Sequence, residues 1–279
     1  MNNQALKSKY RLLVLMDNFK ASHNALKNAI NLAKLIDGCI EVFQVQKITS
    51  EVSYGNQISF MGAIHEECSK QKEEFRNIVN LLAKKEGLPV TCNFTFGNVK
   101  NEIDKHIKKT NPDIVVIGKR KKKIVNFLGD GITKGLLEDH DGAVLISGDN
   151  EAFTSYYRKS IGFLNNVEGI EKITLLNDLK KYNREPHKLF KINQNDLKRK
   201  NDESAKLVEQ QTKKETIVYE FEASANTASG MANLISNNNL ALLCLNKKNK
   251  NRGSFSNGLN EIFTKTIEQT SIPVLVLNN

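Results

Sequence analysis

Short apolar runs alternate with amphipathic segments along the first half of the chain. The runs have the composition of strands buried in a parallel sheet, and they span 11–17, 40–45, 90–96, 113–117 and 143–146. The amphipathic segments carry apolar residues on one helical stripe, and they are the stretch from Ser22 to residue 36, 65–85, 99–109 and the segment with Ile132, Leu136 and Leu137. This order predicts a doubly wound parallel sheet of five strands. Residues 46–64 show no clear period, and a loop is predicted there.

The second half shows a similar order in a weaker form. Strands are predicted at 161–164, 173–176, 216–221, 240–245 and 273–277, and residues 189–192 are a further strand candidate. Helices are predicted at 196–213, 225–235 and 259–269, and the helix expected between the first two strands is reduced to 165–169. The sequence therefore predicts two α/β domains in tandem, 1–148 and 149–279, each built on a doubly wound, Rossmann-like parallel sheet of five strands.

An internal repeat is visible where the two halves end. Residues 114–147 and 240–277 each read as strand, basic loop, helix and strand. Repeats of a whole domain usually pack about a pseudo-two-fold axis. We therefore expect an internal pseudo-dimer in which the strands at 143–146 and 273–277 pair.

Composition narrows the class of protein. None of the apolar runs in the 279 residues approaches the roughly 18 that a membrane helix needs, and the first ten residues lack the apolar core of a signal peptide. The four cysteines have no paired close spacing, which favours reduced thiols and a cytoplasmic location.

The net charge of +10 indicates either a polyanionic partner or a lysine-rich solvated surface. The basic loops lack interleaved aromatic residues, which argues against nucleic acid.

The candidate binding site is the loop after the strand at 113–117. Gly118 ends that strand, the basic run 119–123 follows, and Gly129, Asp130 and Gly131 precede the next helix. A loop that leaves the carboxyl end of a parallel strand and enters a helix is where open α/β sheets bind phosphates. The basic run reads either as a phosphate cradle or as a solvated loop. Asp130 reads either as a phosphate contact or as the N-cap of the helix.

Asp17 is a second candidate, because it stands at the carboxyl end of the first strand. A carboxylate there could bind a ribose or an adenine, or it could cap the turn at 19–21. Both interpretations remain open from the sequence. The five histidines are scattered among polar neighbours at no metal or triad spacing. The residues therefore indicate no nucleophile–base pair and no metal site.

Taken together, these segments resemble a tandem universal stress protein. The strand ending in Asp17, the helix after Ser22 and the strand at 40–45 resemble the opening of that domain, and residues 113–147 resemble its closing strand, glycine loop, helix and final strand. The likeness covers nearly all of 9–148, and in the second half it is clear only from about residue 196. It implies an adenine nucleotide alpha hydrolase-like fold.

The resemblance also assigns roles to the candidate residues. In nucleotide-binding members the closing loop reads Gly-x-x-Gly, a spacer, then Gly-Ser or Gly-Thr. Gly118 stands at the first glycine, whereas Lys121 replaces the second and occupies the space of a phosphate. The later pair aligns either with Gly129 and Asp130, which puts an acid where a phosphate would sit, or with Gly131 and Ile132, which lacks the hydroxyl. Asp17 and Val45 match the adenosine-side positions.

Two hypotheses about function follow from this resemblance. The first is a cytoplasmic stress-response or regulatory protein without clear catalysis, whose nucleotide loop is degenerate and whose partner is an unknown protein. The second is an ATP- or adenine-nucleotide-binding protein with weak hydrolysis, using Asp17, Val45, Gly118, Lys121, Gly129 and Asp130. The residues require no cofactor, and ATP is the ligand that the second hypothesis implies. Association of chains through sheet edges is expected under either hypothesis.

Overall fold

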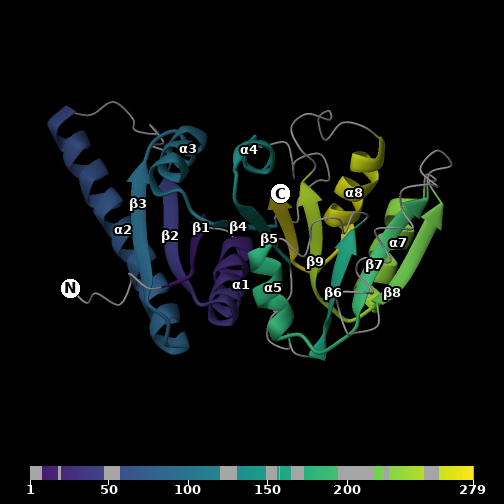
Figure 1. The fold of residues 1–279 in the computed structure, drawn as a ribbon. Coiled ribbons are helices and arrows are strands. Elements are labelled where there is room, and N and C mark those ends of the chain that lie inside the picture. The colour runs from purple at the N-terminus through teal and green to yellow at the C-terminus, as the bar shows by residue number, and fades with distance from the viewer. Residues whose placement is uncertain are drawn as a thin grey trace.

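The computed structural model describes residues 8–17, 20–46, 57–119, 131–148, 156, 158–164, 173–193, 216–222, 226–247 and 258–278. Ten strands in the described residues form one continuous sheet, in the order β3-β2-β1-β4-β5-β10-β9-β6-β7-β8. Figure 1 shows this sheet running across the molecule, with the first half of the chain on the left and the second half on the right.

The first half alternates strand and helix throughout. Its elements are β1 (Tyr10–Met16), α1 (Lys20–Ile36), β2 (Gly38–Gln46), α2 (Gln57–Glu86), β3 (Val90–Phe96), α3 (Val99–Thr110), β4 (Ile114–Gly118), α4 (Ile132–Asp139) and β5 (Ala143–Ser147). Strand β1 pairs in parallel with both β2 and β4. The chain therefore adds strands on one side of β1 and then on the other, which confirms the predicted doubly wound sheet.

The second half has the same strand order around β6. Its described elements are β6 (Ser160–Leu164), α5 (Thr174–Lys181), β7 (His187–Asn193), β8 (Thr216–Glu222), α7 (Thr227–Asn237), β9 (Leu240–Lys247), α8 (Gly258–Gln269) and β10 (Val274–Asn278). Strand β6 pairs in parallel with β7 and β9, as β1 pairs with β2 and β4. The helix predicted at 196–213 lies outside the described residues. The domain boundary at 148/149 stays a prediction.

The strand predicted at 173–176 was wrong, because residues 174–181 form helix α5. A short apolar run cannot distinguish a strand from one buried turn of helix. Leu175 and Leu179 lie four residues apart, and both are buried. That spacing places them on one helical face, which packs on the sheet.

The loop predicted at 46–64 was too long, because α2 begins at Gln57 and includes Gly62. A single interior glycine costs a helix only about 1 kcal/mol relative to alanine. Ile58, Met61 and Ile64 recur every three residues in the sequence, a helical spacing that outweighs the glycine.

The two halves meet at an antiparallel strand pair. Strand β10 pairs with β5, with Leu275 opposite Leu145, Val274 opposite Ile146 and Val276 opposite Val144. The strands that the repeat predicted to pair therefore do so. The two five-stranded parallel sheets that we expected are joined into one sheet at this strand pair, which we call the seam. The register is symmetric about the central pair of Leu145 and Leu275, as expected for two repeats that pack about a pseudo-two-fold axis.

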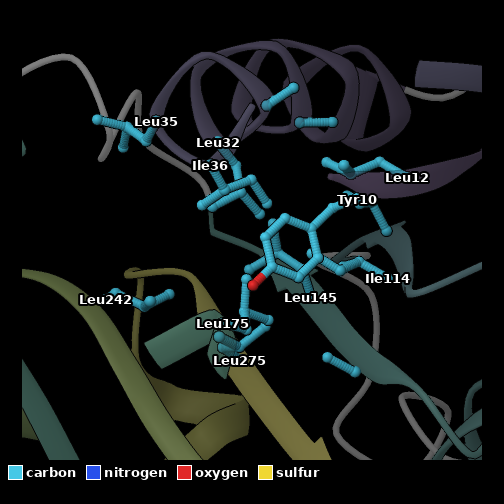
Figure 2. Close-up of a cluster of buried hydrophobic side chains, with 14 of the residues drawn as sticks. Tyr10, Leu12, Leu32, Leu35, Ile36, Ile114, Leu145, Leu175, Leu242 and Leu275 are labelled. Carbon is cyan, nitrogen blue, oxygen red and sulfur yellow. The ribbon is translucent and has the colours of Figure 1, made fainter. Parts of the chain in front are cut away.

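Helices cover both faces of the sheet. Buried residues of α1, α2 and α5 form one core with strand residues from both halves. Buried residues of α4, α7 and α8 form the core on the opposite face, where Ile103 of α3 packs against Leu13 and Phe43. Figure 2 shows that the first core crosses the seam, with the ring of Tyr10 close to Leu175 and Leu275 of the second half.

Candidate functional site

Three of the predicted site residues lie at one edge of the sheet. Asp17 directly follows β1, Val45 is the penultimate residue of β2, and Gly118 is the last residue of β4. These three parallel strands are neighbours, so their carboxyl ends share that edge. The strand order reverses at β1, and ligands of open α/β sheets bind at such a switch point.

Asp17 takes part in the turn between β1 and α1. The hydroxyl of Ser22 donates a hydrogen bond to Oδ1 of Asp17, and the backbone N–H of Asp17 donates to Oγ of Ser22 at 3.2 Å. Ser22 lies in the first turn of α1, which begins at Lys20. Of the two interpretations left open for Asp17, the turn contact is observed.

Val45 belongs to the packing of the sheet. It is partly buried against the cluster of Leu13, Phe43 and Ile103, beneath α3. A valine in this place offers an apolar surface beside the end of β1. Its side chain has no donor or acceptor, so only its backbone could hydrogen-bond a ligand.

Gly118 lies opposite Ser147 of β5. Ser147 is completely buried, and its Oγ accepts a 2.7 Å hydrogen bond from Nδ2 of Asn28 on α1. The same hydroxyl donates to the carbonyl of Gly148 at 3.2 Å. Asn28 therefore fixes the end of β5, and with it the position of Gly118, from the α1 side of the sheet.

Lys119 has a role that the sequence did not reveal. Its ammonium donates to the carbonyl of Ile267 at 2.7 Å and to the carbonyl of Thr270, both at the end of α8. The basic run was read as a phosphate cradle or a solvated loop, and its first lysine does neither: it reaches the second half. The sequence around Lys119 gives no sign of these contacts, because the two partner residues lie 148 and 151 positions further along the chain.

The rest of the predicted loop falls outside the described residues. This applies to Lys121, Gly129 and Asp130, three of the six predicted site residues. The prediction that Asp130 is the N-cap of α4 was wrong, because the N-cap is Gly131, with φ 70°. A positive φ favours glycine at that position.

Residues 10–143 match the model of the Universal stress protein family. Those residues form a universal stress protein domain. No curated protein sequence matches the chain.

Solved structures that share the fold align with both halves of the chain. A universal stress protein from Archaeoglobus fulgidus DSM 4304 is 15% identical, covers 98% of this chain and 97% of its own, and has a TM-score of 0.73. A putative universal stress protein from Pseudomonas aeruginosa UCBPP-PA14 is 11% identical, covers 96% of this chain and 93% of its own, and has a TM-score of 0.61. At such identities the likeness concerns the fold.

The universal stress protein domain is tied to the second half by a buried carboxylate. Asp178 of α5 accepts hydrogen bonds from the Tyr10 hydroxyl at 2.7 Å and from Lys9 at 2.5 Å, and its other oxygen accepts one from Lys181 at 2.8 Å. These contacts with Lys181, Lys9 and Tyr10 hold the pKa of Asp178 well below its ordinary value. Burial, and then the hydrogen bond to Asp178, raises the pKa of Tyr10.

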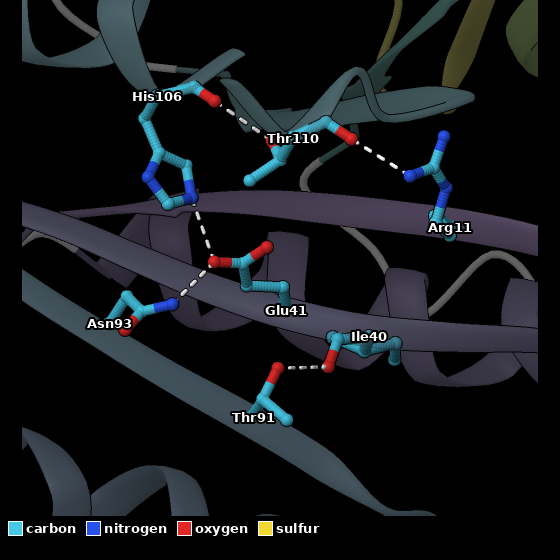
Figure 3. Close-up of polar contacts among 7 residues, drawn as sticks. All are labelled: Arg11, Ile40, Glu41, Thr91, Asn93, His106 and Thr110. Carbon is cyan, nitrogen blue, oxygen red and sulfur yellow. Dashed lines mark hydrogen bonds and ion pairs between the residues drawn. The ribbon is translucent and has the colours of Figure 1, made fainter. Parts of the chain in front are cut away.

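A second polar cluster lies under α3 of the universal stress protein domain (Figure 3). Oε1 of Glu41 accepts a 2.6 Å hydrogen bond from Nδ2 of Asn93 and lies 2.7 Å from Nε2 of His106. The imidazole of His106 stacks on the ring of Phe43, with centroids 4.0 Å apart. The cluster joins β2 and β3 to α3.

The second half has a cluster of opposite charge in the corresponding place. Lys188 lies opposite the second residue of β8, as Glu41 lies opposite the second residue of β3. Its ammonium donates to the backbone carbonyl of Asn238 at 2.5 Å, and the Tyr219 hydroxyl donates to Oδ1 of Asn238 at 2.7 Å. Burial lowers the pKa of Lys188.

Within the described residues, no group of three or more His, Cys, Asp or Glu side chains is arranged to hold a metal ion. No described helix combines the length and the apolar character needed to cross a membrane.

Proposed function

We propose that the chain is a cytoplasmic universal stress protein with a regulatory role and no catalytic reaction. In the first half, the resemblance assigns the sheet edge at Asp17, Val45 and Gly118 to a nucleotide. In this chain that edge instead helps to hold the two halves together. The observation that carries this proposal is the commitment of the Lys119 ammonium to the carbonyls of Ile267 and Thr270. The lysine that follows Gly118 directly is used for docking the two halves.

The remaining polar groups of the edge support the same view. Oδ1 of Asp17 accepts a hydrogen bond from Ser22, so it closes a turn. Lys121 stands in the sequence where nucleotide-binding relatives have glycine, and a long side chain there competes with a phosphate for space. The partner under this proposal is a protein, and its identity is open.

Calorimetry with ATP, ADP and AMP, each with and without magnesium, tests the proposal. We expect no heat of binding at high ligand concentration. Micromolar binding that is lost in Asp17→Ala or Lys121→Glu, and retained in Lys134→Glu, would overturn it. Lys134 is the control because it is an exposed lysine of α4 paired with Glu138.

A second candidate function is adenine-nucleotide binding with slow hydrolysis. The observation that favours it is that Asp17, Val45 and Gly118 lie at neighbouring strand ends, on the edge where open α/β sheets bind ligands. Absorbance at 260 nm after denaturation of the purified protein distinguishes the candidates. A released nucleotide in about equal amount to protein supports the second candidate, and none supports the first.

A further inference from the structure

Helix α2 presents two apolar side chains to solvent. Ile78 and Leu81 are 42% and 74% exposed, and residues three apart are neighbours on the surface of a helix. The side of α2 that faces the core is set by Phe75 and Val79, which are buried, and the ring of Phe75 lies near that of Phe94 in β3, with centroids 5.9 Å apart. The rotation of α2 on the sheet is therefore fixed, and Ile78 and Leu81 form one apolar patch on its solvent side.

Two opposite charges flank this patch at equal spacing. Glu74 lies four residues before Ile78, Lys85 lies four residues after Leu81, and both side chains are exposed. A step of four residues stays on one side of a helix, so the four residues form a stripe that reads acid, apolar, apolar, base. We call these four residues the α2 stripe. In the described part of the chain, neither Glu74 nor Lys85 forms an ion pair.

The α2 stripe is complementary to a second copy of itself in the antiparallel direction. A two-fold axis midway between Ile78 and Leu81 sets Ile78 against Leu81 of the second copy and Glu74 against its Lys85, and the symmetry makes each contact twice. A parallel arrangement would instead set each charge against a like charge, which repels. The order of the charges therefore favours the same chain as the partner and selects its direction.

The α2 stripe lies where a second copy can reach it. Helix α2 leads into β3, which is the edge strand of the sheet in the first half. Figure 1 shows α2 at the outer end of that half, away from the second half. The seam between β5 and β10 lies in the middle of the sheet, so contact through α2 leaves it intact.

We propose that the α2 stripe is the contact surface of a homodimer. The two α2 helices pack antiparallel, with Ile78 and Leu81 of both copies at the centre and a Glu74–Lys85 pair on each side. A contact between single helices is smaller than the roughly 1,200 Å² that stable interfaces bury, so the dimer is weak and forms at high protein concentration. The dimer does not rest on the proposed function, because the α2 stripe contains none of the predicted nucleotide-site residues.

Sedimentation velocity of the full chain, from about 10 µM to about 1 mM, tests the dimer in the range where weak complexes form. The wild type should shift from one chain to two as its concentration rises. Glu74→Lys and Lys85→Glu each turn both charge pairs of the dimer into like-charge pairs, and we expect each to raise the dissociation constant by roughly tenfold. An equimolar mixture of these two variants should associate as tightly as the wild type, because opposite charges then face one another again.

Two control variants make the same charge changes beside the α2 stripe. Glu73→Lys and Lys84→Glu alter exposed residues that lie one position away, about 100° round the helix, and the dissociation constant should stay that of the wild type. Circular dichroism checks that every variant is folded. A wild type that sediments as one chain throughout overturns the proposal. So does an association that persists in Leu81→Asp, or a mixture that associates no more tightly than its two components, because the contact then lies elsewhere.

Discussion

The hydroxyl of Tyr10 in β1 donates a 2.7 Å hydrogen bond to Oδ2 of Asp178 in α5. The two residues are 168 positions apart in the chain. Both are buried, with 9% of Tyr10 and 7% of Asp178 exposed, and α1 and α5 lie side by side next to them. Asp178 therefore holds the two halves together at the amino-terminal end of β1, while Lys119 does so at the carboxyl end of β4.

Removal of the carboxylate should destabilise the protein more than removal of the hydroxyl. Asp178→Ala leaves the buried Tyr10 hydroxyl without its acceptor, and we expect it to lower the free energy of unfolding by about 1–3 kcal/mol. Tyr10→Phe leaves Asp178 with both lysines, and we expect a loss of about 1 kcal/mol or less. Urea denaturation followed by circular dichroism measures both.

The control for this comparison is the exposed ion pair between Lys34 and Glu86, with a 2.9 Å separation of Nζ and Oε2. Glu86→Ala should change the free energy of unfolding by about 0–1 kcal/mol, as is usual for exposed pairs. If Asp178→Ala is no more destabilising than Glu86→Ala, the buried carboxylate does not hold the halves together.

The lowered pKa of Asp178 predicts a contribution to stability that depends on pH. Its contacts with Lys181, Lys9 and Tyr10 favour the ionised form in the folded state. The stabilisation is therefore complete above the ordinary aspartate pKa of about 3.9 and is lost as the pH falls below it. We expect the difference in free energy of unfolding between the wild type and Asp178→Asn to be constant from about pH 7 to 5 and to shrink towards pH 3.

Urea denaturation of both proteins at each pH measures that difference. The lowered pKa of Glu86 acts in the same direction, but it is common to both proteins and cancels in the comparison. A difference that grows as the pH falls would contradict the assignment.

Much of the sheet could be predicted because its strands are buried on both faces. Strand β4 reads as an uninterrupted apolar run, and its first four residues are all buried. Helix α5 could not be predicted in the same way, because the apolar run that opens it is too short to have a period. Two of the three partners of the buried Asp178, Lys9 and Tyr10, lie about 170 residues earlier in the chain, so the sequence around α5 does not reveal them.

For the candidate site, the sequence was sufficient to predict which residues lie at this edge of the sheet. Asp17, Val45 and Gly118 could be placed at that edge because parallel strands end together. The partner of Lys119 could not be predicted, since its position depends on how the halves dock. A basic run in a sequence looks the same whether its lysines face water, a phosphate or the end of a distant helix.

The central leucine pair of the seam should contribute to the stability of both halves. Leu145 and Leu275 lie opposite one another and are fully buried in a core that contains residues of both halves. We expect Leu145→Ala and Leu275→Ala each to lower the free energy of unfolding by about 2–5 kcal/mol. Leu81→Ala, at a leucine with 74% exposure, should change it by less than about 0.5 kcal/mol.

A shared core also predicts one cooperative transition. Circular dichroism and tyrosine fluorescence should give the same unfolding midpoint in the wild type and in both seam variants. Two separate transitions in the wild type, or a loss confined to one of them in Leu275→Ala, would show that the halves unfold independently.

Glycine at position 148 should be required by the seam itself. A Cβ added to Gly148 would lie 2.2 Å from the backbone oxygen of Ser271 and 2.8 Å from the nitrogen of Pro273. These backbone atoms directly precede β10 and cannot move aside without shifting the strand, so we expect Gly148→Ala to cost about 1–3 kcal/mol or more. Gly162 is the matched control, because the three atoms nearest its added Cβ all belong to side chains, the closest being Cδ1 of Leu240 at 2.9 Å. Thermal and urea denaturation should rank Gly148→Ala as the more destabilising change, and the reverse order would mean that the backbones of the seam can separate at little cost.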